Sequence, residues 1–333
     1  MLSIATRGSA LALAQANMVL AQCRTAFPKL AFELKIIKTT GDKLQTASMA
    51  QEGSSLPKGL FTKELEVALL ERKADLAVHS LKDLPTELPQ GLKLGAVGKR
   101  ADVRDVLIYR DAANSRSEGH DGQSNARDSE RRGFRAGQAV QDLPAGAIVA
   151  TSSTRRRAQL LALNPQLKSP DIRGNVLTRI QKLAGKPELD ATVLALAGLV
   201  RLGYEITPEG RLQGKDVPNG VLATILDPEV MLPCVGQGAI GIEIREKDDS
   251  AADVCHALND FATYQCVTAE RAFLAGMGGG CQSPVAAYAE VDGKDLRMRA
   301  LSFASGPMRR AEAKRPMSEP IELGNHLAAI LRS

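Results

Sequence analysis

A cysteine follows a run of glycines near the end of the chain, in the segment Gly276-Met277-Gly278-Gly279-Gly280-Cys281-Gln282-Ser283-Pro284. Glycine has no Cβ and adopts positive φ readily, so a bulky group can approach the Cys281 thiol closely. A free cysteine in a tight turn is the simpler interpretation. However, cations earlier in the chain suit a large anionic adduct, so Cys281 is a candidate attachment site.

A hydroxyl, an amine and a carboxylate follow the apolar run Leu76-Ala77-Val78. The run predicts a buried parallel strand whose carboxyl end delivers Ser80, Lys82 and Asp83 together. Ligands bind at that edge in open α/β sheets. In most Lys-Asp dipeptides the acid is a surface residue paired with the lysine, and this interpretation of Asp83 stays open from spacing alone.

Positive charge gathers between residues 151 and 180, where six cations accompany one acid, Asp171. A charge run is usually a solvated face. Here hydroxyls follow a predicted strand and open a helix, which favours anions, and guanidiniums at element ends suit bidentate binding of carboxylates or phosphates. Arg7 lies in another strand-to-helix turn, and Arg201 adds a further cation. The cations are Arg155, Arg156, Arg157, Lys168, Arg173 and Arg179, and the hydroxyls are those of Thr151, Ser152 and Ser153.

Composition narrows the class of protein. The 333 residues are 44% hydrophobic and 24% charged, as in ordinary globular proteins, and this length predicts two or three domains. Aromatic residues make up only 3% and tryptophan is absent, which argues against base stacking on single-stranded nucleic acid. Five cysteines without CxxC spacing and four scattered histidines give no structural zinc pattern. We expect no metal, no nucleic acid and no membrane partner.

The N-terminal segment faintly resembles an export signal, but Gln15 and Asn17 interrupt its apolar run. Leu11, Ala14, Met18 and Ala21 instead predict the apolar face of an amphipathic helix. No stretch approaches the ~20 apolar residues of a membrane span. We therefore expect a cytoplasmic protein.

The periodicity predicts an α/β protein in which strands and helices alternate. Residues 112–140 read as a flexible, poorly ordered surface insertion. Gly236-Gln237-Gly238-Ala239-Ile240-Gly241 matches the dinucleotide fingerprint by letter, but residues 239–244 alternate like a strand, so we reject that cofactor and expect a bend between domains at 236–238. Predicted strands are 2–5, 32–38, 92–97, 105–109, 147–150, 191–196 and 296–303, and predicted helices are 9–26, 61–69, 251–258, 260–276 and 321–331.

Eight motifs, in order, closely resemble the hydroxymethylbilane synthase family, also called porphobilinogen deaminase. The resemblance covers nearly the whole chain except the insertion. The motifs are Ala5-Thr6-Arg7, Gly59-Leu60-Phe61-Thr62-Lys63-Glu64-Leu65, His79-Ser80-Leu81-Lys82-Asp83-Leu84-Pro85, Thr151-Ser152-Ser153, Arg173-Gly174-Asn175, Ala197-Gly198-Leu199, Gly236-Gln237-Gly238 and Gly279-Gly280-Cys281-Gln282.

The resemblance implies three domains: residues 1–99 with 238–257, residues 104–232, and an α+β domain at 261–333. The first two would resemble the halves of a type II periplasmic binding protein and would form the walls of a cleft. It further implies a dipyrromethane cofactor bound to Cys281 through a thioether, on which four porphobilinogen molecules are joined with loss of ammonia. Hydrolysis then releases the linear tetrapyrrole hydroxymethylbilane. We expect a monomer.

The resemblance also assigns roles to residues. Asp83 would be catalytic, facing the pyrrole nitrogens, stabilising the developing azafulvene cation and transferring protons. The cofactor would be held by Lys82, Asp83, Ser80, Thr151, Ser152, Ser153, Arg155, Arg156, Arg173 and Gly174, with Arg156 and Arg173 nearest its carboxylates. Substrate would be bound by Arg7, Ser9, Arg179, Arg201 and Lys58.

Two departures from the family pattern stand out. The segment Gln51-Glu52-Gly53-Ser54-Ser55-Leu56-Pro57 is longer than usual and lacks a lysine common in the family, and Gly278 stands where an acid is often found. The alternative function is a non-catalytic solute-binding protein, which would require export and would have no use for the Cys281 thiol. A DNA-binding regulator with a ligand-sensing domain is less consistent, since no helix-turn-helix precedes the α/β region.

Overall fold

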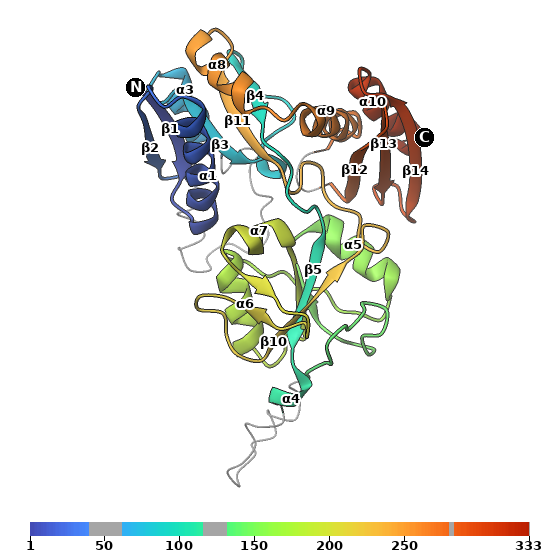
Figure 1. Cartoon of the computed structure of the whole chain (residues 1–333). Helices are drawn as coiled ribbons and strands as arrows, with labels where there is room; N and C mark the ends of the chain where they lie inside the picture. Colours follow the sequence, from blue (N-terminus) through green and yellow to red (C-terminus); the bar gives the residue numbers. More distant parts are fainter. Residues whose placement is uncertain (40–61, 116–131, 280–282, 333) are drawn as a thin grey trace. The chain divides into compact units, whose positions relative to one another are not determined.

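The computed structural model describes residues 1–39, 62–115, 132–279 and 283–332 (Figure 1). The chain divides into two compact units. Unit 1 contains residues 1–101 and 234–333, and unit 2 contains residues 102–233. Within the described ranges, no helix is long and apolar enough to cross a membrane. The predicted alternation of strands and helices is confirmed in both units.

Unit 1 begins with a five-stranded sheet in the order β2-β1-β3-β11-β4. β1 is parallel to β2 and β3, whereas β11 is antiparallel to β3 and β4. Ile4, Leu76 and Ile242 pack with α1 and α8 on one face, and Ala5 and Ala77 pack with α3 on the other. The bounds are β1 Leu2–Arg7, α1 Ala10–Ala26, β2 Phe32–Ile37, α3 Lys63–Leu70, β3 Leu76–Ser80, β4 Leu92–Val97, β11 Ile240–Arg245 and α8 Asp249–Leu258.

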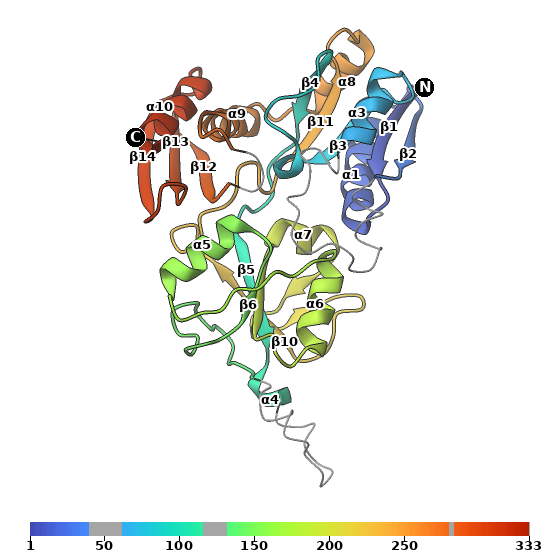
Figure 2. The same cartoon turned by 180° about the vertical axis from the view of Figure 1, so that it is seen from behind.

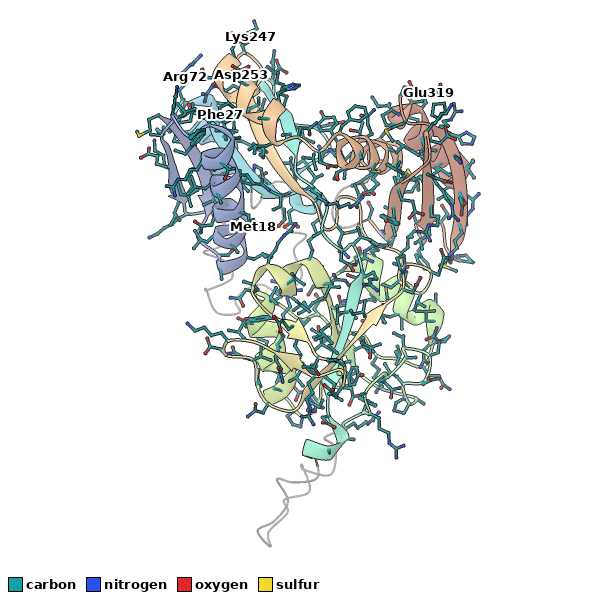
Figure 3. The ribbon with its side chains drawn as sticks, viewed as in Figure 1. Met18, Phe27, Arg72, Lys247, Asp253 and Glu319 are labelled. Carbon is teal, nitrogen blue, oxygen red and sulfur yellow. The ribbon has the colours of Figure 1, made fainter. Side chains whose placement is uncertain are left out.

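Helix α1 begins where the sequence predicts, because the Ser9 hydroxyl accepts a hydrogen bond from the backbone N–H of Ala12 at 3.3 Å. The predicted apolar face is wrong. Met18 is 46% exposed, and Figure 3 shows it on the outer side of the helix. The buried face instead consists of Gln15, Ala16, Val19, Leu20 and Cys23. The prediction failed because alanine and leucine occur all around this helix, so periodicity could not distinguish its faces.

A short 3-10 turn, η1 (Leu81–Asp83), follows β3. Gly236 has φ +71°, and a Cβ there would lie 3.2 Å from the backbone nitrogen of Lys82. The Gly236-Gln237-Gly238 segment is therefore a turn packed closely against η1. β11 follows it directly, so the prediction that a strand comes after these glycines is confirmed.

The C-terminal part of unit 1 is a three-stranded antiparallel sheet, β12-β13-β14, with α9 and α10 packed on one face (Figures 1 and 2). Both helices and β13 confirm the prediction, whereas β14 was missed. Its alternating charged and small residues, Arg309 to Pro316, make it a polar edge strand that lacks the usual apolar pattern. The bounds are α9 Phe261–Gly276, β12 Val285–Asp292, β13 Asp295–Ser302, β14 Arg309–Pro316 and α10 Pro320–Arg332.

Unit 2 contains a four-stranded sheet in the order β10-β5-β7-β6, in which only β6 and β7 are parallel. Helix α5 packs on one face of the sheet, and α6 and α7 pack on the other. The bounds are β5 Asp105–Arg110, α4 Ala112–Ser115, β6 Val149–Ala150, α5 Thr154–Leu163, α6 Val176–Gly185, β7 Ala191–Ala195, α7 Leu196–Arg201, β8 Glu205–Ile206, β9 Leu212–Gln213 and β10 Val221–Leu226.

The prediction that residues 112–140 form a poorly ordered insertion is wrong at its C-terminal end. Phe134 is buried and packs edge-on against Tyr109 at a centroid distance of 6.0 Å, and Val140 is fully buried. Residues 116–131 lie outside the described residues. The polar composition of the segment hid two apolar residues that belong to the core of unit 2.

Candidate active site

In unit 1, a cavity of about 70 Å³ lies where β1 and β3 end. Four residues predicted from the sequence line it: Arg7, Ser9, Ser80 and Asp83. Lys82 lies in the same turn as Asp83 and is half-buried, but it is not among the residues that line the cavity. The expectation that the carboxyl end of β3 carries ligand-facing groups therefore agrees with the geometry of this unit.

The Asp83 carboxylate is exposed, and within the part of the chain that the structure describes it makes no hydrogen bond or ion pair. In particular, no Asp83–Lys82 salt bridge forms among those residues. An exposed acid that lines a cavity and has no partner among the described residues is available to a ligand. Its carboxylate can accept hydrogen bonds or a proton.

Gln15, which the sequence interpretation missed, lines the same cavity. Its side-chain amide donates to the Ser80 hydroxyl at 2.9 Å and accepts from it at 3.0 Å. Gln15 is only 2% exposed. Its sequence signal was a polar residue on the apolar side of a helix, but the wrong assignment of that side concealed it.

Backbone contacts hold the turn that carries Asp83. Arg271 of α9 donates to the carbonyl oxygens of Leu84 at 3.1 Å, Pro85 at 2.6 Å and Thr86 at 3.2 Å. The N–H of Leu81 donates to the carbonyl of Ala239 at 3.1 Å. These bonds fix the turn from both sides without engaging the Asp83 side chain.

In unit 2, two loops that precede helices are hydrogen-bonded to each other. The Ser152 hydroxyl donates to the carbonyl of Ile172 at 2.8 Å and accepts from its N–H at 3.1 Å. Ser153 caps α5, and Asn175 caps α6. The N-termini of two ten-residue helices are thereby tied together, and each favours negative charge.

Arg173 is exposed beside these helix N-termini. Gly174 has φ +119°, and a Cβ there would lie 2.7 Å from the Thr178 side chain, so the turn requires glycine. Arg179 donates through Nε to the carbonyl of Gly174 at 2.8 Å. Thr151 is buried, and its hydroxyl accepts from the N–H of Ser153 at 3.2 Å.

Arg155 and Arg156 are buried, with 3% and 6% exposure, and both pair with the fully buried Asp105. Each guanidinium lies 2.7 Å from one Asp105 carboxylate oxygen. Arg155 also donates to the carbonyl of Leu232 at 2.6 Å and Arg156 to that of Val193 at 2.9 Å. Burial works to raise the pKa of Asp105, but the two guanidiniums outweigh it and lower that pKa. The cluster therefore carries a net charge of +1, from two cations and one anion.

Arg201 is the last residue of α7 and is half-buried, in a helix rather than the predicted turn. Burial lowers the pKa of its guanidinium. Two other predicted site residues, Cys281 and Lys58, lie outside the described residues. The positions of these two side chains therefore stay predictions.

Two family models match the sequence of this chain, one over the residues of the site described above and one over the C-terminal segment. Residues 2–253 match the family model described as porphobilinogen deaminase, dipyromethane cofactor binding domain, and residues 264–333 match the model of its C-terminal domain. The chain belongs to the porphobilinogen deaminase family. The resemblance found from the eight sequence motifs is confirmed.

Among related porphobilinogen deaminases, that of Thermus thermophilus is 42% identical over 98% of this chain and 93% of its own length. That of Deinococcus radiodurans is 38% identical over 98% of this chain and 94% of its own length. The structural similarity to a probable extracellular-binding protein of an amino-acid ABC transporter from Bacillus subtilis is weak. The TM-score is 0.39 at 10% identity, covering 77% of this chain and 89% of that one.

The residues of unit 2 fit the dipyrromethane cofactor that this porphobilinogen deaminase family model names. Dipyrromethane carries carboxylates on its pyrrole rings, and carboxylates bind at helix N-termini and to guanidiniums. The tied N-termini of α5 and α6 and exposed Arg173 supply both kinds of donor. Arg155 and Arg156 lie in the first turn of α5, and their cluster with Asp105 of β5 adds fixed charge of the right sign.

Proposed function

We propose that the chain is a hydroxymethylbilane synthase, a transferase that joins four porphobilinogen molecules with loss of ammonia and releases a linear tetrapyrrole. Its family membership supports the reaction. The observation that carries the site assignment is the exposed Asp83 carboxylate, which lacks a partner among the described residues and lines a cavity with Arg7, Ser9 and Ser80.

Asp83 acts as the catalytic carboxylate. It accepts hydrogen bonds from the pyrrole N–H of the substrate and stabilises the positive charge that develops there as ammonia leaves. It also takes the proton that substitution on the pyrrole ring releases. The bonds from Arg271 to the following carbonyls keep the turn in place, so little reorganisation is needed.

Cations neutralise the carboxylates of substrate and cofactor, and hydroxyls donate hydrogen bonds to them. Arg7 and Ser9 in unit 1 bind substrate carboxylates, as do Arg179 and Arg201 in unit 2, together with Lys58. The cofactor would be held by Lys82, Ser80, Asp83, Thr151, Ser152, Ser153, Arg155, Arg156, Arg173 and Gly174. When bound through Cys281, the dipyrromethane supplies a covalent primer for chain growth.

The buried position of Arg155 and Arg156 sharpens their role. Each uses two of its guanidinium nitrogens on Asp105 and a carbonyl oxygen, so neither is a mobile surface cation. We infer that they act through fixed charge. Arg173, which is exposed, is the more adaptable contact.

We also infer a three-domain organisation, with residues 1–99 and 238–257, 104–232, and 261–333 as domains. The family matches, which end at residue 253 and begin again at 264, support the last boundary. We propose that the protein is a monomer and that it is located in the cytoplasm. The free thiols of Cys23, Cys234, Cys255 and Cys266 suit a reducing compartment. Light scattering during size-exclusion chromatography measures the molar mass in solution and so tests whether the protein is a monomer.

Intact-protein mass tests the covalent cofactor. We expect the purified protein to exceed its sequence mass by two linked pyrroles and Cys281→Ser to remove the excess. Cys234→Ser is a matched control, because Cys234 is another free thiol and the excess mass should survive its replacement. An active protein at bare sequence mass would contradict the covalent primer.

Asp83→Asn tests the catalytic carboxylate separately. The amide keeps the size of the side chain but can neither take up a proton nor balance a cation. We expect the variant to retain the extra mass and to lose turnover by roughly a hundredfold or more. Glu87→Gln, at another exposed acid shortly after the same turn, should leave turnover unchanged. Near-normal turnover of Asp83→Asn would assign the proton chemistry to another group.

A further inference from the structure

A buried cluster of three ionisable side chains lies on the α3 face of the first sheet in unit 1. Nε2 of His79 lies 2.9 Å from Oε2 of Glu243, and the two side chains are 3% and 0% exposed. Glu66 of α3 is also buried, with 8% exposure. The proposed reaction leaves all three residues without a task.

Strand register explains how the cluster assembles. Glu243 of β11 stands opposite Ala77 of β3, and His79 is two residues farther along β3, so both side chains point to the same face. Leu65 and Leu69 of α3 pack on that face, and Glu66 of the same helix is buried with them.

Packing alone does not account for these residue types. The surrounding positions are apolar, and burying a carboxylate without full compensation costs several kcal/mol. Within the described ranges, Oε1 of Glu66 and Oε1 of Glu243 lack hydrogen-bond partners. No three His, Cys, Asp or Glu side chains in those ranges converge as a metal site. A proton can satisfy such an oxygen.

The groups around the cluster favour proton uptake. Burial raises the pKa of Glu66. The Thr62 hydroxyl and His79 oppose the rise, while Glu243 and Glu64 add to it. Glu66 therefore keeps its proton more readily than an ordinary glutamate does.

The cluster adjoins the cavity that Asp83 lines. His79 and Thr62 are lining residues of that cavity, together with Ser80. The charged groups that face the cavity are Arg7 and Asp83. A cavity of about 70 Å³ with polar walls has room for water that could carry a proton between these groups.

We propose that His79, backed by Glu243 and Glu66, is a buried proton relay for Asp83. The proposal deepens the proposed function and rests on it. His79 acts through Asp83 and is a positioning and relay residue, since it is 5% exposed overall.

The proton balance is simple. Loss of ammonia breaks the carbon–nitrogen bond of the aminomethyl group, and a carbon–carbon bond to a pyrrole ring forms in its place. The carbon–hydrogen bond at that ring carbon then breaks: its electron pair returns to the ring, and the proton bonds to the Asp83 carboxylate. Asp83 then passes the proton to His79, whose imidazolium is stabilised by Glu243. The proton finally leaves on the released ammonia as ammonium, which restores both groups for the next addition. No oxidant or reductant is needed.

A direct test is the titration of His79 in the wild-type protein by NMR of histidine-labelled enzyme. The four histidines are His79, His120, His256 and His326, and single His→Gln variants assign their signals. We expect the His79 ring signal to respond to pH in the wild-type protein and that response to change in Glu66→Gln. A His79 signal that stays constant over a pH scan from about 5 to 9 overturns the proposal, even if the variants fold poorly.

A kinetic test separates a relay from a merely structural histidine. His79→Gln and Glu243→Gln should lower kcat roughly tenfold or more, change KM less than about twofold and remove one limb of the kcat–pH profile. The exposed His256 of α8 provides the control, since His256→Gln should match wild type. A His79→Gln profile with the wild-type shape overturns the proposal.

The two proposals fail differently. Wild-type protein without excess mass and without turnover would refute the synthase function. Wild-type protein with both, and a His79→Gln variant with an unchanged pH profile, would refute only the relay.

Discussion

The two units hold their functional groups in opposite ways. In unit 2, side chains are themselves tied down: Arg155 and Arg156 are buried against Asp105, and Ser152 bonds the neighbouring loop. In unit 1, hydrogen bonds from Arg271 and the close packing of Gly236 hold the backbone around Asp83. The Asp83 carboxylate itself makes no bond among the described residues.

The roles proposed for these groups account for the difference. A cation that neutralises carboxylates works best as fixed charge, because fixed dipoles and charges need no reorganisation. A carboxylate that exchanges protons must remain unpaired, because a strong partner would lower its pKa, as happens to Asp105 despite its burial. Unit 2 therefore has the properties of a rigid binding surface, and unit 1 those of a site for proton transfer.

The largest effect should come from breaking the fixed charge of unit 2. Asp105→Asn leaves two buried guanidiniums without their anion, so we expect a loss of about 3–5 kcal/mol in the free energy of unfolding. Chemical denaturation at neutral pH measures it. Asp102→Asn is the control, since Asp102 pairs with Arg104 at the surface and should contribute less than about 1 kcal/mol.

The stability of the same variant should also depend on pH differently from that of wild type. Because the pKa of Asp105 is lowered in the folded protein, its stabilisation is present above its ordinary pKa of 3.8 and is lost as the pH falls. Asp105→Asn should therefore be less sensitive to acid than wild type. Equal costs for Asp102→Asn and Asp105→Asn would remove the contrast between surface pairing and fixed buried charge.

The next effect tests how the backbone of unit 1 is held. Gly236→Ala places a Cβ 3.2 Å from the backbone of Leu81 and Lys82 and forces alanine into positive φ. We expect a loss of roughly 2–4 kcal/mol together with reduced turnover. Gly293→Ala is a matched control with φ +67° and no atom near its Cβ, and it should cost only the conformational part, about 1 kcal/mol.

Equal losses in the two glycine variants would show that the approach to η1 is unimportant. A larger loss at Gly236 with normal turnover would separate stability from placement of Asp83. Either result would weaken the view that unit 1 orients its carboxylate through the backbone.

A smaller effect should follow from Arg271→Met. The variant removes three bonds to the carbonyls after Asp83 but leaves the carboxylate in place. We expect kcat to fall roughly tenfold with little change in KM, since small displacements of a catalytic group slow the reaction. Arg309→Met removes comparable bonds to carbonyls at Ile330 and Leu331, and its turnover should stay normal. Similar kcat values in the two variants would contradict a positioning role.

Much of this arrangement could be predicted from the sequence. The strand ending at Ser80 and the helix starting after Ser9 carry strong local signals, an apolar run and a cap. The motifs placed Arg7, Ser80 and Asp83 at one edge, and the cavity they line agrees with that.

The rest depended on tertiary contacts that leave no local signal. Pairing of Arg155 and Arg156 with Asp105 joins residues about fifty positions apart, and the composition of the basic segment gave no sign of that partner. Gln15 and His79 became visible only when the buried faces of α1 and β3 were known. β14 was missed because an edge strand with exposed charges lacks an apolar pattern.

The smallest effect concerns the protonatable cluster of unit 1. Burial raises the pKa of Glu66, so the folded protein holds its proton more tightly than the unfolded chain does. The sign follows from linkage: stability is fully present below the ordinary pKa of 4.5 and is lost as the pH rises through the folded pKa. Glu66→Gln, which mimics the protonated acid, should gain stability relative to wild type as the pH rises, with a slope no steeper than about 1.4 kcal/mol per pH unit. Denaturation curves from pH 5 to 8 measure this difference.

Glu71→Gln, at an exposed acid directly after α3, should run parallel to wild type. If Glu66→Gln also runs parallel, Glu66 gives up its proton at its ordinary pKa, and the opposite pH responses expected for Glu66 and Asp105 are contradicted.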